Sequence, residues 1–337
     1  MAIGIDVGTS SIKIISTVKQ KGQARLLAAG AVKSPPRGMS SEADQDLAAL
    51  AATIKKLVSD TKVVGRDVIV GLPESEVVTK VISLPKMSDQ ELASAIEWEA
   101  EQYIPMPITE VNVSYDVLFR PKEDAGQMKV SLVAAPKKLV EKYVKVFDMA
   151  GLKIMAVETE LIAVARALVP ENSGTQMVVD MGARGTDIAV VSGGRVVFSR
   201  SIATAGEAMS RAVAAGLSME PVQAEEYKKA YGLSTSALEG KVRGVILPIF
   251  DMIATEVRKA LEFYRSQATG DPVKSVIVSG GSAGMSEIVS ELAGKLGIEV
   301  AVGDPIAPLV KDEKMAAALT GFSTLYAVAV GLSLREM

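Results

Sequence analysis

Two short apolar runs, 3–7 and 12–15, open the chain, with isoleucine or valine at alternate positions. A period of two predicts β-strands, and the glycine and hydroxyl residues between the runs predict a tight turn. This turn consists of Gly8, Thr9, Ser10 and Ser11. With Asp6 before it and Lys13 after it, its N–H groups and hydroxyls could cradle phosphate oxygens. Taken alone, the stretch could also be an ordinary surface hairpin.

The same pattern returns near the middle of the chain, where residues 177–191 again read as two strands around a turn. Asp180 and Gly182 repeat the spacing of Asp6 and Gly8, and the second turn contains Gly182, Ala183, Arg184, Gly185 and Thr186. A third loop, with Gly280, Gly281 and Ser282, follows the apolar strand 275–278. We expect it to lead into a helix near Met285, whose N-terminus would attract an anion. Three such loops in two halves indicate a nucleotide site.

Other periodic segments fill in the two halves. The first half is predicted to contain strands at 24–34, 67–71 and 153–157, with helices at 46–60 and 158–168. Residues 171–174 are the expected hinge. The second half is predicted to contain strands at 176–181, 186–192 and 195–202, then helices at 205–216, 221–230 and 240–269, and a terminal helix at 323–334.

Residues 77–150 are interpreted as an inserted subdomain. A helix at 88–103 starts with a capping-box pattern, two strands at 111–119 and 128–134 flank a polar turn at 121–127, and a helix follows at 136–150. Trp98 is expected to pack into the core. The acidic residues of the first helix are expected to form a solvated face.

Composition narrows the chemistry. The chain has 337 residues and a net charge of −3, without cysteine or histidine. Disulfides, thiolate nucleophiles and histidine-based catalysis are therefore excluded, which leaves carboxylates, lysine, hydroxyls and a hard cation such as Mg²⁺. The slightly negative net charge does not indicate a basic surface for nucleic-acid binding. The uncharged stretch 315–334 is long enough for a membrane span, but its Thr, Gly, Ser and Ala content favours a buried helix. The start at a strand predicts no signal peptide, and so a cytoplasmic protein.

The paired Asp-x-Gly hairpins, the late Gly-Gly loop and the two helices between them resemble the actin, hexokinase and heat-shock ATPase superfamily. The resemblance implies an α/β, two-domain actin-like (ribonuclease-H-like) ATPase fold that binds ATP or ADP with Mg²⁺. It assigns Gly8 to Ser11 with Lys13 to the first phosphate loop and Gly182 to Thr186 to the second. The adenosine loop would then contain Gly280, Gly281 and Ser282.

By the same resemblance, Gly206 and Glu207 lie in the loop that leads into the cleft, and Glu225 and Lys228 lie on a ribose-contacting helix. Glu158 occupies the place of the residue that positions the attacking water. Asp6 and Asp180 would hold the water shell of Mg²⁺. Hydrolysis is expected to be slow or absent, because no histidine is available and the second loop carries Ala183 and Arg184. Arg184 could contact the γ-phosphate or point to solvent.

The segments 98–105, 194–202 and 331–335 closely resemble the PilM family of type IV pilus assembly proteins, and the insert lies where the cell-division protein FtsA carries its own. This resemblance implies a cytoplasmic adapter at the inner face of the inner membrane. It would bind the cytosolic N-terminal peptide of PilN in a groove beside the insert. It would thereby link the membrane alignment complex to the rest of the pilus machine, with other alignment and motor components as further partners.

The expected domains are a first half at 1–76 and 151–171, an FtsA-like insert at 77–150 and a second half at 172–337, of which about 205–272 is a smaller subdomain. Two alternatives stay open: a small-molecule kinase of the same superfamily, and an FtsA-like filament former that self-associates. FtsA-like chains end in an amphipathic membrane helix. The end shortly after Leu334 therefore predicts contact with the membrane only through a partner.

Overall fold

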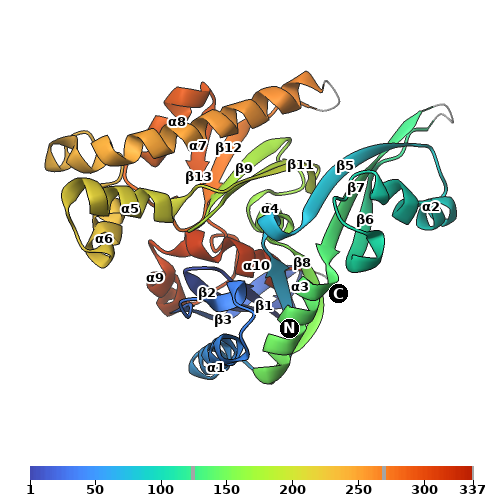
Figure 1. The fold of residues 1–337 in the computed structure, drawn as a ribbon, viewed down its shortest axis with the longest axis horizontal. Helices are drawn as coiled ribbons and strands as arrows, with labels where there is room; N and C mark the ends of the chain where they lie inside the picture. Colours follow the sequence, from blue (N-terminus) through green and yellow to red (C-terminus); the bar gives the residue numbers. More distant parts are fainter. Residues whose placement is uncertain (123–125, 268–270, 336–337) are drawn as a thin grey trace.

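A computed structural model describes residues 1–122, 126–267 and 271–335 of the chain. Parts of the predicted turn at 121–127 and the end of the predicted helix at 240–269 lie outside these ranges, as do the last two residues of the predicted second half. Two five-stranded sheets dominate the structure, and a three-stranded sheet stands beside them (Figure 1).

The two large sheets share one topology. The first has the order β3-β2-β1-β4-β8 and consists of β1 (Ala2–Val7), β2 (Ser11–Gln20), β3 (Gln23–Lys33), β4 (Asp67–Leu72) and β8 (Lys153–Thr159). The second has the order β11-β10-β9-β12-β13 and consists of β9 (Gln176–Met181), β10 (Thr186–Ser192), β11 (Arg195–Ile202), β12 (Ser275–Ser279) and β13 (Glu299–Val302). In each sheet an antiparallel three-stranded meander continues into two parallel strands. The repeat read from the two Asp-x-Gly hairpins is therefore a repeat of whole sheets.

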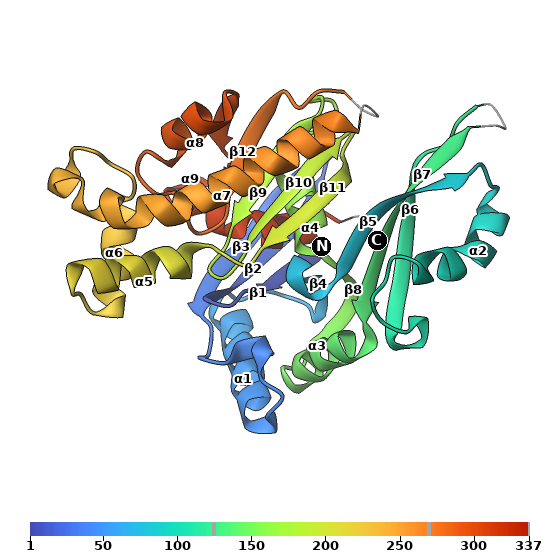
Figure 2. The same ribbon diagram turned by 45° about the horizontal axis from the view of Figure 1, so that its top comes forward.

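Two short helices, α4 (Glu160–Leu168) and α10 (Ala327–Ser333), lie between the large sheets (Figure 1). Figure 2 shows α4 next to β11 of the second sheet. Every residue of α10 is buried, as the sequence predicted, although the α-helix is shorter than expected and follows the 3₁₀ turn Ser323–Tyr326. The helices approach so closely that a Cβ on Gly331 would lie 1.8 Å from the carbonyl oxygen of Ala163. Glycine is required there because no side chain fits.

No single helix in the described ranges is long and apolar enough to cross a membrane. Only a bent pair meets the length and composition together, α9 (Glu313–Leu319) with Ser323–Ser333, and its two parts meet at 96°.

Amphipathic helices cover the outer faces of the sheets. The first sheet carries α1 (Asp44–Asp60) and α3 (Lys137–Met149), and the second half carries α5 (Gly206–Leu217), α6 (Pro221–Tyr231), α7 (Lys241–Ser266) and α8 (Ile288–Leu296). Short 3₁₀ turns lie at Gly38–Ser40, Glu74–Glu76, Ile108–Glu110 and Ala237–Gly240. α3 buries Tyr143 and Phe147 against the first sheet, so in packing terms it belongs to the first half. We propose on this basis that the insert ends before α3.

The insert has its own core, formed by β5 (Val78–Pro85), α2 (Asp89–Glu101), β6 (Val111–Phe119) and β7 (Gln127–Pro136) in the sheet order β5-β7-β6. Ser88 caps α2, and Glu91 completes the predicted capping box. The expectation for Trp98 is wrong, because its side chain is 66% exposed. α2 buries Leu92, Ile96 and Ala100 on one face, and position 98 lies on the opposite face of the helix.

Candidate functional site

The loop that the resemblance assigns to the first phosphate site follows β1. Asp6, the last residue but one of this strand, is buried and lies opposite Lys13 on β2. The Nζ of Lys13 donates to Oδ2 of Asp6 over 2.9 Å. Burial alone would lower the pKa of Lys13, but the charge and the hydrogen bond of Asp6 outweigh it and raise this pKa. A Cβ on Gly8 would lie 3.0 Å from Nζ, so glycine leaves room for the ammonium group beside the loop.

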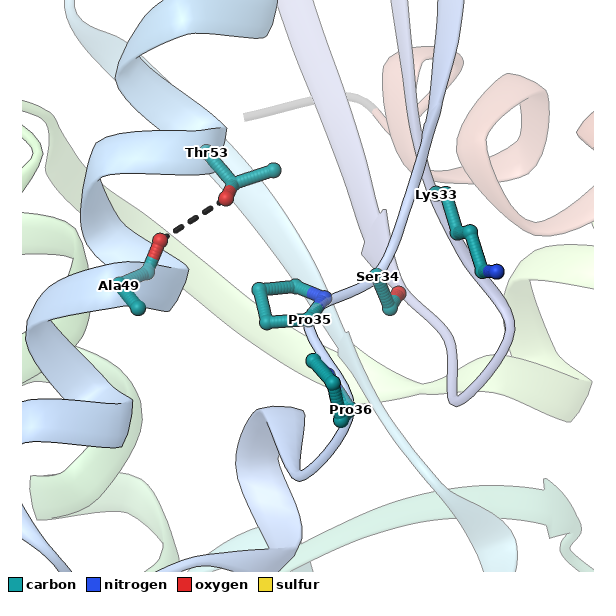
Figure 3. Close-up of a pocket in the computed structure, with 6 residues that line it drawn as sticks. All are labelled: Lys33, Ser34, Pro35, Pro36, Ala49 and Thr53. Atoms are coloured by element: carbon teal, nitrogen blue, oxygen red, sulfur yellow. Dashed lines mark hydrogen bonds between the residues drawn. The ribbon is translucent and has the colours of Figure 1, made fainter.

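Ser34, just after β3, fixes the loop from behind. Its hydroxyl donates to the carbonyl oxygen of Gly8 over 2.6 Å, and its N–H donates to the carbonyl oxygen of Ser10 over 3.0 Å. Figure 3 shows the neighbouring hollow of about 660 Å³, which lies between the end of β3 and α1 and is lined by Lys33, Ser34, Pro35, Pro36, Ala49 and Thr53. Thr9 and Ser10 themselves are exposed. Their hydroxyls remain accessible to a ligand.

The second hairpin differs from the first at one decisive position. Asp180 lies opposite Asp187, where the first hairpin has the pair of Asp6 and Lys13. Burial, followed by the like charge of Asp187, raises the pKa of Asp180 to about 7. Burial also raises the pKa of Asp187 to about 6. One oxygen of each carboxylate, Oδ1, is buried without a hydrogen-bond partner within the described structure. The second hairpin therefore pairs two carboxyl groups at the position where the first hairpin pairs a carboxylate with an ammonium group.

Glu160, at the start of α4, faces the same junction between the halves. Burial, then the charges of Asp6, Asp187 and Asp180, raise its pKa well above the ordinary value. Its Cγ would lie 3.1 Å from a Cβ on Gly71, so β4 holds it closely. The sequence analysis missed Glu160. Thr159 caps α4. A helix that starts at Thr159-Glu160 directly after a strand is the sequence signal by which Glu160 could have been found.

Glu158, the residue predicted to position water, is engaged elsewhere. Its carboxylate accepts two hydrogen bonds from Arg166, at 2.5 and 2.8 Å, and one from Arg335 at 3.3 Å. The Glu158 side chain is only 6% exposed. The two arginines hold Glu158 in an ion-pair network, so Glu160, and not Glu158, is the carboxyl group that lies among Asp6, Asp180 and Asp187.

The charges at this junction do not balance. Asp6, Asp180, Asp187 and Glu160 converge there, and Lys13 is the cation whose charge opposes the rise in the pKa of Glu160 and of Asp180. No set of three or more acidic residues in the described ranges is arranged to enclose a metal directly. A hard cation that keeps its water shell fits such a set, since Mg²⁺ is commonly bound by one or two carboxylates, water and substrate phosphates.

The second phosphate loop is tied to the start of α5. The N–H of Gly206 donates to the carbonyl oxygen of Gly182 over 3.2 Å, and that of Glu207 donates to Ala183 over 2.8 Å. Within the loop, the N–H of Gly182 donates to the carbonyl oxygen of Gly185 over 3.0 Å. The hydroxyl of Thr186 donates to the carbonyl oxygen of Thr204 over 2.8 Å. The loop and the N-terminus of α5 thus form one hydrogen-bonded unit.

Arg184 extends from this loop toward Glu207, with 3.5 Å between Nε and Oε2, and its side chain is 54% exposed. In this structure it therefore neither points freely into solvent nor lies among the buried carboxylates. A phosphate would have to compete with Glu207 for it.

Lys228 on α6 brings a buried ammonium group to the same place. Its Nζ donates to Oε2 of Glu225 over 2.7 Å and to the carbonyl oxygen of Gly206 over 3.2 Å. Burial lowers its pKa. A Cβ on Gly206 would lie 2.6 Å from Oγ of Ser282 and 3.1 Å from Nζ of Lys228. The residues assigned by resemblance to ribose and adenosine contacts therefore meet at Gly206.

The third loop packs against the end of β9 at Gly280. Its φ is +87°, and a Cβ there would lie 2.5 Å from the carbonyl oxygen of Met181, so only glycine fits. The N–H of Ser282 donates to the same carbonyl over 3.1 Å. The helix expected near Met285 starts later, at Ile288, and a series of turns precedes it. Turn N–H groups, and not a helix N-terminus, follow the glycine pair.

A second hollow, of about 570 Å³, adjoins this loop. It is lined by Ala283, Gly284, Met285, Glu287, Ile288, Val289, Ser290, Val302, Gly321, Ser323 and Thr324. The N–H of Gly280 donates to Thr324 over 3.3 Å, which joins the loop to the segment before α10.

Comparisons with known proteins agree with this architecture. The solved structure described as "PilM-PilN type IV pilus biogenesis complex" is similar at a TM-score of 0.86 and 27% identity, over 99% of this chain and 98% of that one. The ethanolamine utilization protein EutJ of Carboxydothermus hydrogenoformans gives 0.59 at 17% identity, over 99% and 89%. MreB5 of Spiroplasma citri, bound to AMPPNP, gives 0.54 at 15% identity, over 98% and 93%. The two-domain actin-like fold is thereby confirmed.

Curated relatives match over smaller parts of the two chains. EutJ of Escherichia coli (strain K12) is 30% identical over 149 residues, which are 44% of this chain and 47% of that protein. FtsA of Streptococcus pneumoniae is 21% identical over 301 residues, covering 81% of this chain and 64% of FtsA. The chain thus spans about half the length of the EutJ relative that it matches.

The match to one family extends over nearly the whole sequence. The profile described as "Type IV pilus assembly protein PilM" matches residues 4–337. It includes both phosphate hairpins, the insert and α10. The chain belongs to the PilM family of type IV pilus assembly proteins.

Proposed function

We propose that the protein binds ATP together with Mg²⁺ at the junction between its halves. The observation that carries this proposal is the second hairpin, where Asp180 and Asp187 are paired as like charges with an unpartnered oxygen on each. A divalent cation there offsets repulsion that the protein's own side chains leave in place. Bound nucleotide in the fold relatives, AMPPNP in MreB5 of Spiroplasma citri, supports this assignment.

Each part of the site then has a defined task. The N–H groups and hydroxyls of Gly8 to Ser11 donate to phosphate oxygens, and Lys13 supplies positive charge behind them. Asp6 and Asp180 orient the water shell of the cation. Lys228 and Glu225 contact the ribose, and Ser282 and the turn around Gly280 and Gly281 border the base.

Turnover is proposed to be slow or absent. Glu160 is the carboxylate that faces the junction, and its raised pKa favours the protonated form, which does not accept a proton from water. A bound cation lowers that pKa and restores a weak base. ATP would then act mainly as a ligand that holds the two halves together.

A nucleotide titration tests the binding site. Asp180→Asn is expected to weaken the affinity for Mg²⁺-ATP more than that for ATP in EDTA, because the lost carboxylate acts only through the cation. Asp67→Asn, at an exposed strand start, is the control. Equal affinities of the wild-type protein for ATP with and without Mg²⁺ would contradict the proposal.

We also propose that the protein is a pilus assembly adapter that binds the cytosolic N-terminal peptide of PilN. Similarity to the PilM-PilN complex over 99% of this chain supports it. Through such a partner the protein would lie at the cytoplasmic face of the inner membrane, and connect other alignment and motor components to it.

Open sheet edges offer a place for such a peptide. β6 ends the three-stranded sheet and β8 ends the first large sheet, so each has one edge without a strand partner in the described structure. Apolar side chains are exposed on both, with Tyr115 at 37%, Phe119 at 56% and Met155 at 45%. An extended peptide added to an edge gains main-chain hydrogen bonds, and neighbouring side chains fix its register.

Titration of a fluorescently labelled PilN N-terminal peptide, with and without Mg²⁺-ATP, tests the adapter role. Saturable binding is expected, and Tyr115→Asp or Met155→Asp should weaken it, because a charge would have to be desolvated beside the peptide. Val64→Asp, at an exposed position on the first half, is the matched control. Absence of binding at tens of micromolar in both nucleotide states would remove the support for the adapter and favour self-assembly.

A further inference from the structure

The exposed face of α2 is an unusual surface that neither the nucleotide site nor the proposed peptide edges use. α2 lies at the outer side of the insert, away from the two large sheets (Figure 1). Trp98, the only tryptophan of the chain, stands on this face with 66% of its side chain exposed. Aromatic side chains such as tryptophan are more frequent at protein–protein interfaces than on the rest of the protein surface.

Carboxylates surround this tryptophan. α2 contains Asp89, Glu91, Glu97, Glu99 and Glu101, and no lysine or arginine. Asp89 pairs with Arg120, and Glu91 closes the capping box, so both have local tasks. Glu97 and Glu101 are exposed, and the described ranges record no ion pair or hydrogen bond for their side chains.

Helix stability does not explain these charges. The C-terminal end of a helix carries partial negative charge, so acidic side chains in the last turn are unfavourable there, and α2 has no basic residue in that turn. Glu97 and Glu101 are also spaced i, i+4, where like charges repel each other. The helix therefore keeps, around its one exposed aromatic ring, a set of charges that a cation from outside would relieve.

We infer that Trp98, Glu97 and Glu101 form a docking face for a basic segment of a partner protein. An arginine guanidinium can stack on the indole ring while its N–H groups reach the two carboxylates, which stand one residue before and three residues after Trp98. A second copy of this chain is a poorer occupant, since copies that each carry a net charge of −3 repel each other. The face belongs to α2 and includes no residue of the β6 or β8 strands, so it would bind a second partner beside the PilN peptide.

The single tryptophan makes the test direct, because intrinsic fluorescence reports this face alone. The probe is a short synthetic helical peptide with arginines along one side, and the matched probe has neutral citrulline at those positions. Saturable quenching or a shift of Trp98 emission is expected with the arginine peptide and not with the citrulline peptide. The PilN peptide, present at saturation, should leave this response unchanged.

Variants separate a specific face from net charge. With a labelled arginine peptide, Trp98→Ala and the double variant Glu97→Gln/Glu101→Gln are each expected to weaken binding about two- to fivefold, the loss from one exposed cation–π contact or from two surface ion pairs. Glu262→Gln/Glu299→Gln removes the same charge from exposed positions elsewhere and should bind as the wild type does. Thermal unfolding should show the Glu97→Gln/Glu101→Gln protein to be at least as stable as the wild type.

Two results would overturn the inference. Equal weakening by Glu262→Gln/Glu299→Gln would show that only net charge matters. A change of Trp98 emission with protein concentration alone, together with dimers in sedimentation, would show that a second copy covers the face.

Discussion

Replacing Asp180 by Asn should stabilise the nucleotide-free protein, and by an amount that depends on pH. The folded protein raises the pKa of this carboxyl from 3.8 to about 7, through burial and then through Asp187. The folded state therefore binds this proton more tightly than the unfolded chain does. The stabilising contribution of the proton is fully present below the unfolded pKa, and it is lost as the pH rises toward 7.

The size of the effect follows from the shift. A pKa raised from 3.8 to about 7 corresponds to about 4 kcal/mol between the two protonation states. The side chain is only half-buried, so solvent screening reduces this figure. We expect the advantage of Asp180→Asn over the wild type to grow by about 1–3 kcal/mol between pH 5 and pH 8.

Urea unfolding followed by circular dichroism, at several pH values and without nucleotide or Mg²⁺, measures this difference. Asp67→Asn, at an exposed carboxylate, controls for the general effect of removing one negative charge and should show a constant offset. A difference between Asp180→Asn and the wild type that stays constant with pH would refute the assignment of a buried like-charge pair. So would a variant that is less stable than the wild type at pH 8.

Two further predictions concern the junction between the halves. Glu160→Gln should lower any ATP turnover more than it lowers nucleotide affinity. Glu158→Gln should leave turnover unchanged and lower the free energy of unfolding by about 1–3 kcal/mol, because charged hydrogen bonds are lost. Single-turnover assays and urea unfolding distinguish the two variants, and the opposite pattern would restore Glu158 to the catalytic role. Gly331→Ala should destabilise the protein by about 1–3 kcal/mol or more, because its Cβ would lie 1.8 Å from the Ala163 oxygen. Gly294→Ala, on an exposed helix face with nothing within 4 Å, should be neutral or stabilising, and equal effects of the two changes would disprove the close-contact argument.

Features that depend on neighbouring residues alone were predictable from the sequence. The alternation in 3–7 and 12–15 placed β1 and β2, and its return at 177 placed β9 and β10, because the side chains of a strand alternate between its two faces. The Ser88 capping box fixed the start of α2 for the same local reason. The three glycine-containing loops were located correctly, and the structure brings Gly182, Gly206 and Ser282 together.

Expectations based on residue type were less successful. Trp98 is predicted to lie inside because single tryptophans at helical spacing usually pack inward, but the helix buries Leu92, Ile96 and Ala100, and Trp98 lies on the other side. β13 and α9 were not predicted, since both are short and their positions depend on neighbours distant in sequence.

Tertiary structure decided how charges are shared among segments that are far apart in the chain. The sequence offered Glu158 and Glu160 within one short stretch, and only the packed structure shows Arg335, at the other end of the chain, beside the first of them. It also shows that Asp187 takes the place across from Asp180 that Lys13 takes across from Asp6. A carboxylate's pKa and partners depend on burial and on charges within a few ångströms, and those distances are fixed by the packing of the two sheets on α4 and α10.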